Sequence, residues 1–139
     1  MTHGELEEGS ALALDFGKLD SVRGVVPVAV QDAASRDVIL VAYTNEAAMR
    51  ESFRKRRLVL WSTSRGELWE KGATSGCTFE LVAAYVNCEQ NSLLYVVRPH
   101  PPGSAHGICH TRDSSGAYRP GCFYRRIDLD TLELRNERP

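Results

Sequence analysis

Residues 25–43 read VVPVAVQDAASRDVILVAY, in which two apolar runs rich in β-branched residues, 25–30 and 38–43, flank a short polar segment. Runs of this length and composition are typical of β-strands, and a short polar connection between them is typical of a hairpin. The stretch therefore predicts a β-hairpin. Because Pro27 has no backbone N–H to donate to a neighbouring strand, we expect it to lie at a sheet edge or at a bulge.

The next segment, residues 44–57, reads TNEAAMRESFRKRR and predicts a helix. Thr44 or Asn45 can cap its start, and it has an acidic residue in its first turn and basic residues in its last. Met49 and Phe53 are four positions apart and therefore share one helix face. The basic end has two interpretations: a solvated helix terminus that complements the helix dipole, or a phosphate site.

Further strands are predicted at residues 58–61, 68–69, 78–86 and 93–97. The chain from residue 98 to residue 121 is rich in Pro, Gly, Ser and His, and a loop of that length in a small domain is usually functional or mobile. Together the patterns predict an α+β fold that is mainly β, a small antiparallel β domain with one principal helix.

The chain has 139 residues, 42% of them hydrophobic, which suits a single domain with an adequate core. We divide it into a flexible acidic N-terminal arm at 1–14 and the domain at 15–139. A formal net charge of −1 gives no bulk attraction to nucleic acid or to an anionic membrane, so neither partner is expected. The sequence shows no signal peptide pattern and no apolar run near the roughly 20 residues of a membrane span. We expect a cytoplasmic protein whose four cysteines stay reduced.

Three of those cysteines, Cys88, Cys109 and Cys122, are the main candidates for chemistry. Three thiolates can bind one zinc ion and leave its fourth position open for water, which is the arrangement of a hydrolytic site. Their spacing alone does not establish this, because neither interval is the short Cys-x-x-Cys of structural zinc sites. The fourth thiol, Cys77, is either a buried core residue or an additional or alternative ligand.

Several motifs in a fixed order give the chain a family resemblance. They are Gln31-Asp32, AYTNEA at 42–47, WSTSR at 61–65, LWEKGATSG at 68–76, Cys88, CHT at 109–111 and CFYR at 122–125. In this order they resemble phosphoribosyl-AMP cyclohydrolase, an enzyme family of histidine biosynthesis, over nearly the whole body of the chain.

The resemblance implies a zinc-dependent homodimer in which a metal-activated water opens the purine ring of phosphoribosyl-AMP between N1 and C6. The substrate is thus a small phosphorylated nucleotide-like molecule. The resemblance also implies that three cysteines drawn from both subunits hold the zinc, and by position these are Cys88, Cys109 and Cys122.

A proton must leave the attacking water, and His110, which follows Cys109 directly, is our candidate general base. The alternative for His110 is a hydrogen bond within its own loop. His106, three residues before Cys109, could bind metal instead.

The segment WEKGATSG at 69–76 offers a cation, hydroxyl groups and glycines that suit a phosphorylated ligand. We expect Lys71 to act with His110 in catalysis, although an ordinary hairpin with a solvated lysine is the alternative. The candidate substrate-binding residues are Arg65, Thr74 and Ser75.

Two features depart from the family pattern. The family usually has Asp-Cys-Asp-x-Asp around its first cysteine, where the carboxylates bind magnesium, whereas residues 87–91 here read NCEQN. Only Glu89 keeps a charge, so we expect at most a weak second metal site there and doubt that magnesium binds. The loops at 99–106 and 112–120 are also longer than the family's.

These departures keep two alternative functions open. One is a diverged paralogue that hydrolyses or deaminates a different nitrogen heterocycle, because loops beside a metal decide which substrate fits. The other is a zinc-binding dimer without catalysis.

Overall fold

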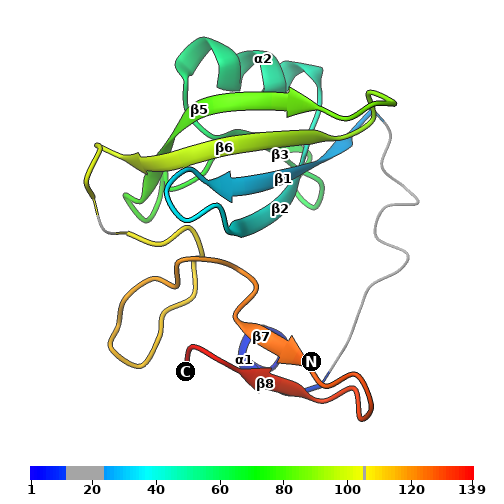
Figure 1. The fold of residues 1–139 in the computed structure, drawn as a ribbon, viewed down its shortest axis with the longest axis vertical. Coiled ribbons are helices and arrows are strands. Elements are labelled where there is room, and N and C mark those ends of the chain that lie inside the picture. The colour runs from blue at the N-terminus through cyan, green and yellow to red at the C-terminus, as the bar shows by residue number, and fades with distance from the viewer. Residues whose placement is uncertain (12–23, 105) are drawn as a thin grey trace.

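The computed structural model describes residues 1–11, 24–104 and 106–139, whose arrangement is shown in Figure 1. The helices and strands, in chain order, are α1 (His3–Glu8), β1 (Val26–Asp32), β2 (Val38–Thr44), α2 (Glu46–Lys55), β3 (Val59–Ser62), β4 (Glu67–Glu70), β5 (Thr78–Val86), β6 (Leu93–His100), β7 (Arg125–Ile127) and β8 (Leu134–Asn136). This order confirms the predicted fold class, an α+β domain that is mainly β with α2 as its principal helix.

A four-stranded sheet in the order β2-β1-β6-β5 forms the body of the molecule. β1 and β2 pair antiparallel, which confirms the hairpin predicted from residues 25–43, and β5 and β6 also pair antiparallel. β1 and β6 are parallel, with Val28 beside Leu93 and Asp32 beside Val97. Parallel neighbours need a long crossover connection, which the chain from β2 to β5 supplies. The sheet is therefore mixed, although most of its pairs are antiparallel.

Pro27 lies neither at a sheet edge nor at a bulge, which corrects the expectation from its residue type. β1 is an internal strand, and its irregularity lies between Val30 and Gln31. Pro27 is the second residue of β1 and pairs with Tyr43 of β2, whereas pairing with β6 begins only at Val28. The missing N–H therefore interrupts no ladder with β6, which is why proline is tolerated at the start of an internal strand.

Helix α2 begins and ends as the sequence indicates. The Asn45 side chain caps it by accepting a hydrogen bond from the backbone N–H of Ala48, and Arg56 ends it in the left-handed region at φ 55°. Near its basic end, Arg54 and Lys55 both pair with Glu51, at 2.5 and 3.5 Å. These pairs favour the solvated helix terminus over a phosphate site.

The hydrophobic core lies on one face of the main sheet. Val28 and Val30 of β1 and Tyr95 and Val97 of β6 are fully buried, because alternate residues of a strand face the same side. Burying each side chain of this size stabilises the fold by about 1.5–3 kcal/mol. The remaining core residues are Ile39, Leu58, Leu60, Phe79, Leu81 and Ile108.

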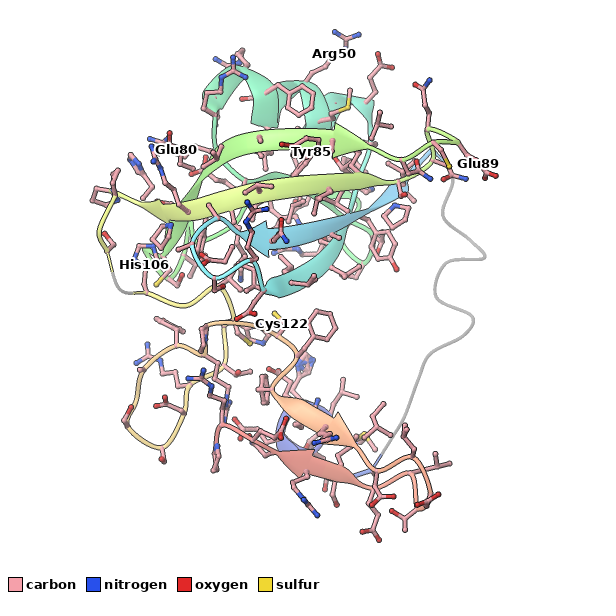
Figure 2. The ribbon with its side chains drawn as sticks, viewed as in Figure 1. Arg50, Glu80, Tyr85, Glu89, His106 and Cys122 are labelled. Atoms are coloured by element: carbon pink, nitrogen blue, oxygen red, sulfur yellow. The ribbon has the colours of Figure 1, made fainter. Side chains whose placement is uncertain are left out.

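The opposite face of the sheet carries an apolar row that is exposed at its two ends and half-buried between them. The register places Val41 beside Ala29, Ala29 beside Leu94, and Leu94 beside Tyr85, so the row crosses all four strands. Val41 is 47% exposed and Tyr85, labelled on β5 in Figure 2, is 60% exposed. We call this set of four residues the outer row.

A smaller lobe is built from both ends of the chain. Helix α1 lies beside the β7–β8 hairpin, as Figure 1 shows, and Ala11 forms a bridge with Glu133. The arm predicted at 1–14 thus contains a helix that sequence analysis did not assign, and residues 12–14, with the predicted boundary, lie outside the described residues. Of the helices in the described ranges, none is long and apolar enough to cross a membrane.

Candidate metal centre and catalytic site

Cys109 and Cys122 are brought together by backbone hydrogen bonds of the loop that follows β6. The N–H of Cys109 donates to the carbonyl oxygen of Arg119 at 3.1 Å, and the N–H of Cys122 donates to the carbonyl oxygen of Ile39 in β2 at 2.8 Å. Cys109 is buried, and the Cys122 side chain lies near enough to shift the pKa of its thiol. Two of the three predicted zinc ligands therefore meet within one chain.

The two thiols have opposite shifts in acidity. Contact with Cys122 lowers the pKa of Cys109 to about 5, aided by Thr111, whose Oγ1 lies 3.0 Å from the Cys109 sulfur. That same contact, together with burial, raises the pKa of Cys122. Cys109 is thus the more acidic thiol of the pair, and both sulfurs are donors suited to zinc.

Cys88 lies elsewhere in the chain. It is exposed in the turn between β5 and β6, beside the end of the sheet where Val86 pairs with Leu93. Figure 2 shows its neighbour Glu89 at that end, whereas Cys122 lies between the sheet and the small lobe. Across the described ranges, no group of three or more His, Cys, Asp or Glu side chains is arranged to hold a metal ion. One chain therefore offers two sulfurs in one place and the third in another.

The turn around Cys88 is closed by amide groups at the positions where the family usually has aspartates. The Nδ2 of Asn87 donates to the Oδ1 of Asn91 at 2.6 Å, and the Oδ1 of Asn87 accepts from the backbone N–H groups of Asn91 and Ser92. Glu89 accepts from the Asn91 side chain at 3.4 Å. Glu89, the residue predicted to bind a second metal weakly, is thus engaged by the Asn91 amide.

His110 is exposed and is paired with an acidic residue from the other end of the chain. Its Nε2 lies 2.5 Å from Oε2 of Glu7 in α1. His106, the alternative metal ligand, forms a hydrogen bond through Nε2 with the carbonyl oxygen of Thr78 at 2.9 Å and packs edge-to-face on Phe79. Those contacts favour a structural role for His106.

Lys71 lies close to the cysteine pair. Its charge acts to lower the pKa of Cys122, although burial and the contact with Cys109 outweigh it. The ammonium nitrogen also lies 5.6 Å from the ring centre of Trp69, which packs against the core. The structure therefore brings Lys71, Cys109 and Cys122 into one region, as the predicted site requires.

The predicted substrate-binding residues occupy two different places. Thr74 and Ser75 are exposed in the turn that follows Lys71, and the Ser75 hydroxyl accepts from the N–H of Cys77. Cys77 itself is buried, which favours its interpretation as a core residue. Arg65 lies in the β3–β4 turn, at the opposite end of β4 from Lys71, and pairs with Glu67 at 3.4 Å.

Sequence reasoning missed two acidic residues of α1 that contact the loop carrying the site. Glu7 contacts His110, and Glu8 pairs with the buried Arg119 at 3.2 Å. The Arg119 guanidinium also donates to the carbonyl oxygen of Arg138 and lies 4.2 Å from the ring centre of Tyr124. No local pattern indicates such pairs, because the partners are more than 100 residues apart in the chain.

Comparison with known proteins shows which family the sequence matches. Residues 40–124 match the family model described as phosphoribosyl-AMP cyclohydrolase. The phosphoribosyl-AMP cyclohydrolase of Halobacterium salinarum is 41% identical over 86% of this chain and 86% of its own length. The enzyme of the same name from Lactiplantibacillus plantarum is 36% identical over 84% of this chain and 94% of its own length. The histidine biosynthesis bifunctional protein HisIE of Thermus thermophilus is 39% identical over 76% of this chain and 44% of its own length.

Proposed function

The chain belongs to the phosphoribosyl-AMP cyclohydrolase family, and on that premise we propose that it opens the purine ring of phosphoribosyl-AMP at the N1–C6 bond in histidine biosynthesis. Family membership confirms the predicted class of enzyme, a hydrolase that acts on a cyclic C–N bond. The observation that carries the proposal is the Cys109–Cys122 pair beside Lys71, because three of the family's motifs, those at 68–76, 109–111 and 122–125, meet there.

Zinc is the metal proposed for this site. The donor set fits it: the two cysteines lie near each other, and Cys122 lowers the pKa of the Cys109 thiol, which favours the thiolate form that zinc binds. When bound, zinc supplies Lewis-acid activation of water, which makes a nucleophile available at neutral pH. Cys109 and Cys122 would hold it from one chain. Magnesium is not proposed, since the amide groups of Asn87 and Asn91 bond to each other.

A homodimer would supply the third thiolate. Cys88 lies at the far end of the β5–β6 hairpin from the cysteine pair, so it would reach the pair of a second copy rather than that of its own chain. The outer row supports this, because Val41 and Tyr85 expose apolar surface on a sheet face that a second copy could cover. Each site would then contain residues of both subunits.

His110 and Lys71 carry the proton and charge chemistry of the proposal. His110 accepts the proton of the attacking water, because it follows a ligand cysteine directly and its side chain is exposed. Lys71 places a positive charge beside the pair, where it offsets the negative charge of the thiolates and of the substrate. The phosphorylated parts of the substrate are bound by Thr74, Ser75 and Arg65. Because Arg65 lies at the opposite end of β4 from Lys71, it would bind substrate in the partner subunit's site or after its turn has rearranged.

A cytoplasmic location stays a prediction, as does the exclusion of nucleic acid and membrane partners.

The test combines metal content with turnover. The purified protein should contain zinc and convert phosphoribosyl-AMP, followed by ultraviolet absorbance, equally well with and without added magnesium. Cys109→Ser should lose both zinc and turnover, whereas Cys77→Ser, the matched control at a buried thiol outside the pair, should keep both.

Stoichiometric zinc without turnover of phosphoribosyl-AMP would contradict the proposed substrate. Turnover of another nitrogen heterocycle in that preparation would instead identify a diverged paralogue. If neither phosphoribosyl-AMP nor another heterocycle is converted, the zinc-binding dimer without catalysis is the remaining alternative. A preparation that binds no zinc at all would refute the cysteine assignment.

A further inference from the structure

The N-terminal helix reaches the proposed catalytic histidine. Glu7 in α1 places Oε2 at 2.5 Å from Nε2 of His110, and its side chain is 26% exposed whereas that of His110 is 69% exposed. The other carboxylate oxygen, Oε1, lies 3.8 Å from Nδ1 of His3. Glu7 is therefore the more enclosed partner, and its carboxylate faces two imidazole rings.

The position of Glu7 does not depend on His110. The Tyr124 hydroxyl donates to the carbonyl oxygen of Glu7 at 2.7 Å, and Arg125 donates to the carbonyl oxygens of Leu6 and Gly9 at 2.9 and 3.1 Å. The neighbouring Glu8 is fixed by the buried guanidinium of Arg119. Both sides of Glu7 in the chain are thus held by side chains from the loop and strand that follow Cys109.

An exposed imidazole is free to rotate unless a partner fixes it, and a general base must present one nitrogen in one direction. A carboxylate that accepts from Nε2–H holds the ring plane and leaves the Nδ1 lone pair as the accepting nitrogen. A hydrogen bond of this kind orients the ring without touching the substrate.

We propose that Glu7 is a positioning residue for His110: its carboxylate, 2.5 Å from Nε2, favours the proton on that nitrogen and so presents Nδ1 as the nitrogen that takes the proton. The inference rests on the proposed role of His110 and extends it to the N-terminal segment, which becomes part of the site. The alternative is an ordinary surface ion pair, whose removal would change neither the orientation of the His110 ring nor kcat.

The first test is kinetic. Glu7→Ala should lower kcat by about tenfold with KM little changed and zinc content unchanged, because the ring loses its orientation while substrate contacts remain. Glu7→Gln, whose amide oxygen can still accept from Nε2–H, should retain more activity than Glu7→Ala. Glu133→Ala, at an exposed position of the same lobe, is the matched control and should keep wild-type kcat.

A double-mutant cycle separates positioning from a general effect on the fold. In the His110→Asn background, Glu7→Ala should have no further effect on kcat, since the residue through which it acts is gone. An unchanged kcat in the single variant, or an equal loss in both backgrounds, would overturn the inference.

The second test is independent of turnover. Imidazole ¹⁵N shifts of the neutral ring, assigned with His110→Asn, should show the Nε2–H tautomer of His110 in the wild-type protein and a mixture of tautomers in Glu7→Ala. Identical His110 spectra in the two proteins would overturn the inference. If the wild-type protein does not convert phosphoribosyl-AMP, the proposed function fails, and these spectra alone still decide whether Glu7 fixes the ring.

Discussion

Restoring the family's carboxylates should make the turn around Cys88 depend on magnesium. In Asn87→Asp combined with Asn91→Asp, the hydrogen bond of 2.6 Å between the two side chains is replaced by two negative charges at that separation. Their repulsion at 2.6 Å in a water-like dielectric is about 1.6 kcal/mol, and the lost hydrogen bond adds about 0.5–1.5 kcal/mol. Because the carboxylates can rotate apart, we expect a net destabilisation of about 2 kcal/mol without metal.

Urea and thermal unfolding at one fixed protein concentration measure this change. The double variant should unfold roughly 5–10 °C below the wild-type protein in a chelator, and added magnesium should restore its stability, because a cation that binds only the folded turn stabilises it. Wild-type stability should not respond to magnesium.

The single variant Asn91→Asp is the matched control for that experiment. Here the Asn87 side-chain N–H groups meet a carboxylate, and the resulting charge-assisted hydrogen bond should keep or raise stability. The reasoning is refuted if the double variant is within about 0.5 kcal/mol of wild type in a chelator, a change typical of any surface substitution.

Three further predictions concern the fold and the assembly. Tyr85→Glu places a charge in the outer row and should prevent two copies from associating through this face. Light scattering should then show a monomer, and metal analysis should show little zinc. A zinc-loaded dimer would contradict a site built from both subunits. Gly72→Ala should destabilise the protein by at least about 2 kcal/mol in urea, because φ is 90° and the added Cβ would lie 1.9 Å from the carbonyl oxygen of Cys77. Leu60→Ala should cost about 2–5 kcal/mol because Leu60 is fully buried, whereas Leu129→Ala, at an 89% exposed position, should change stability by less than about 0.5 kcal/mol; equal effects would contradict the core assignment.

The helices and strands that sequence analysis predicted are those determined by residues close together in the chain. Asn45 and the four-residue spacing of Met49 and Phe53 specify α2 within a few turns of chain, and Phe53 does pack against the core. The β1–β2 hairpin follows from two adjacent apolar runs in the same way. The parallel pairing of β1 with β6 was not predictable from such patterns, because the paired residues are more than 60 positions apart and four other strands lie between them in the chain.

The site divides along similar lines. The family motifs indicated Cys109, Cys122 and Lys71, and the structure brings these three together. The motifs also predicted that Arg65 lies near Lys71 at the substrate site, yet the two residues lie at opposite ends of β4. A motif specifies the order of residues in the chain, and it does not specify where a strand carries them. Arg119 gave no signal at all: arginine is usually exposed, and its burial depends on partners at both ends of the chain.

The small lobe also has a consequence for the order of folding. Helix α1 precedes its partners Arg119, Tyr124 and Arg125 by 111 to 119 residues in the chain. Six residues are too few for a helix to be stable alone, so we expect α1 to form stably only together with these partners. The main sheet and its core can assemble before that, because their contacts need neither terminus. We therefore expect Glu7 to reach His110 late in folding, after the main sheet has formed.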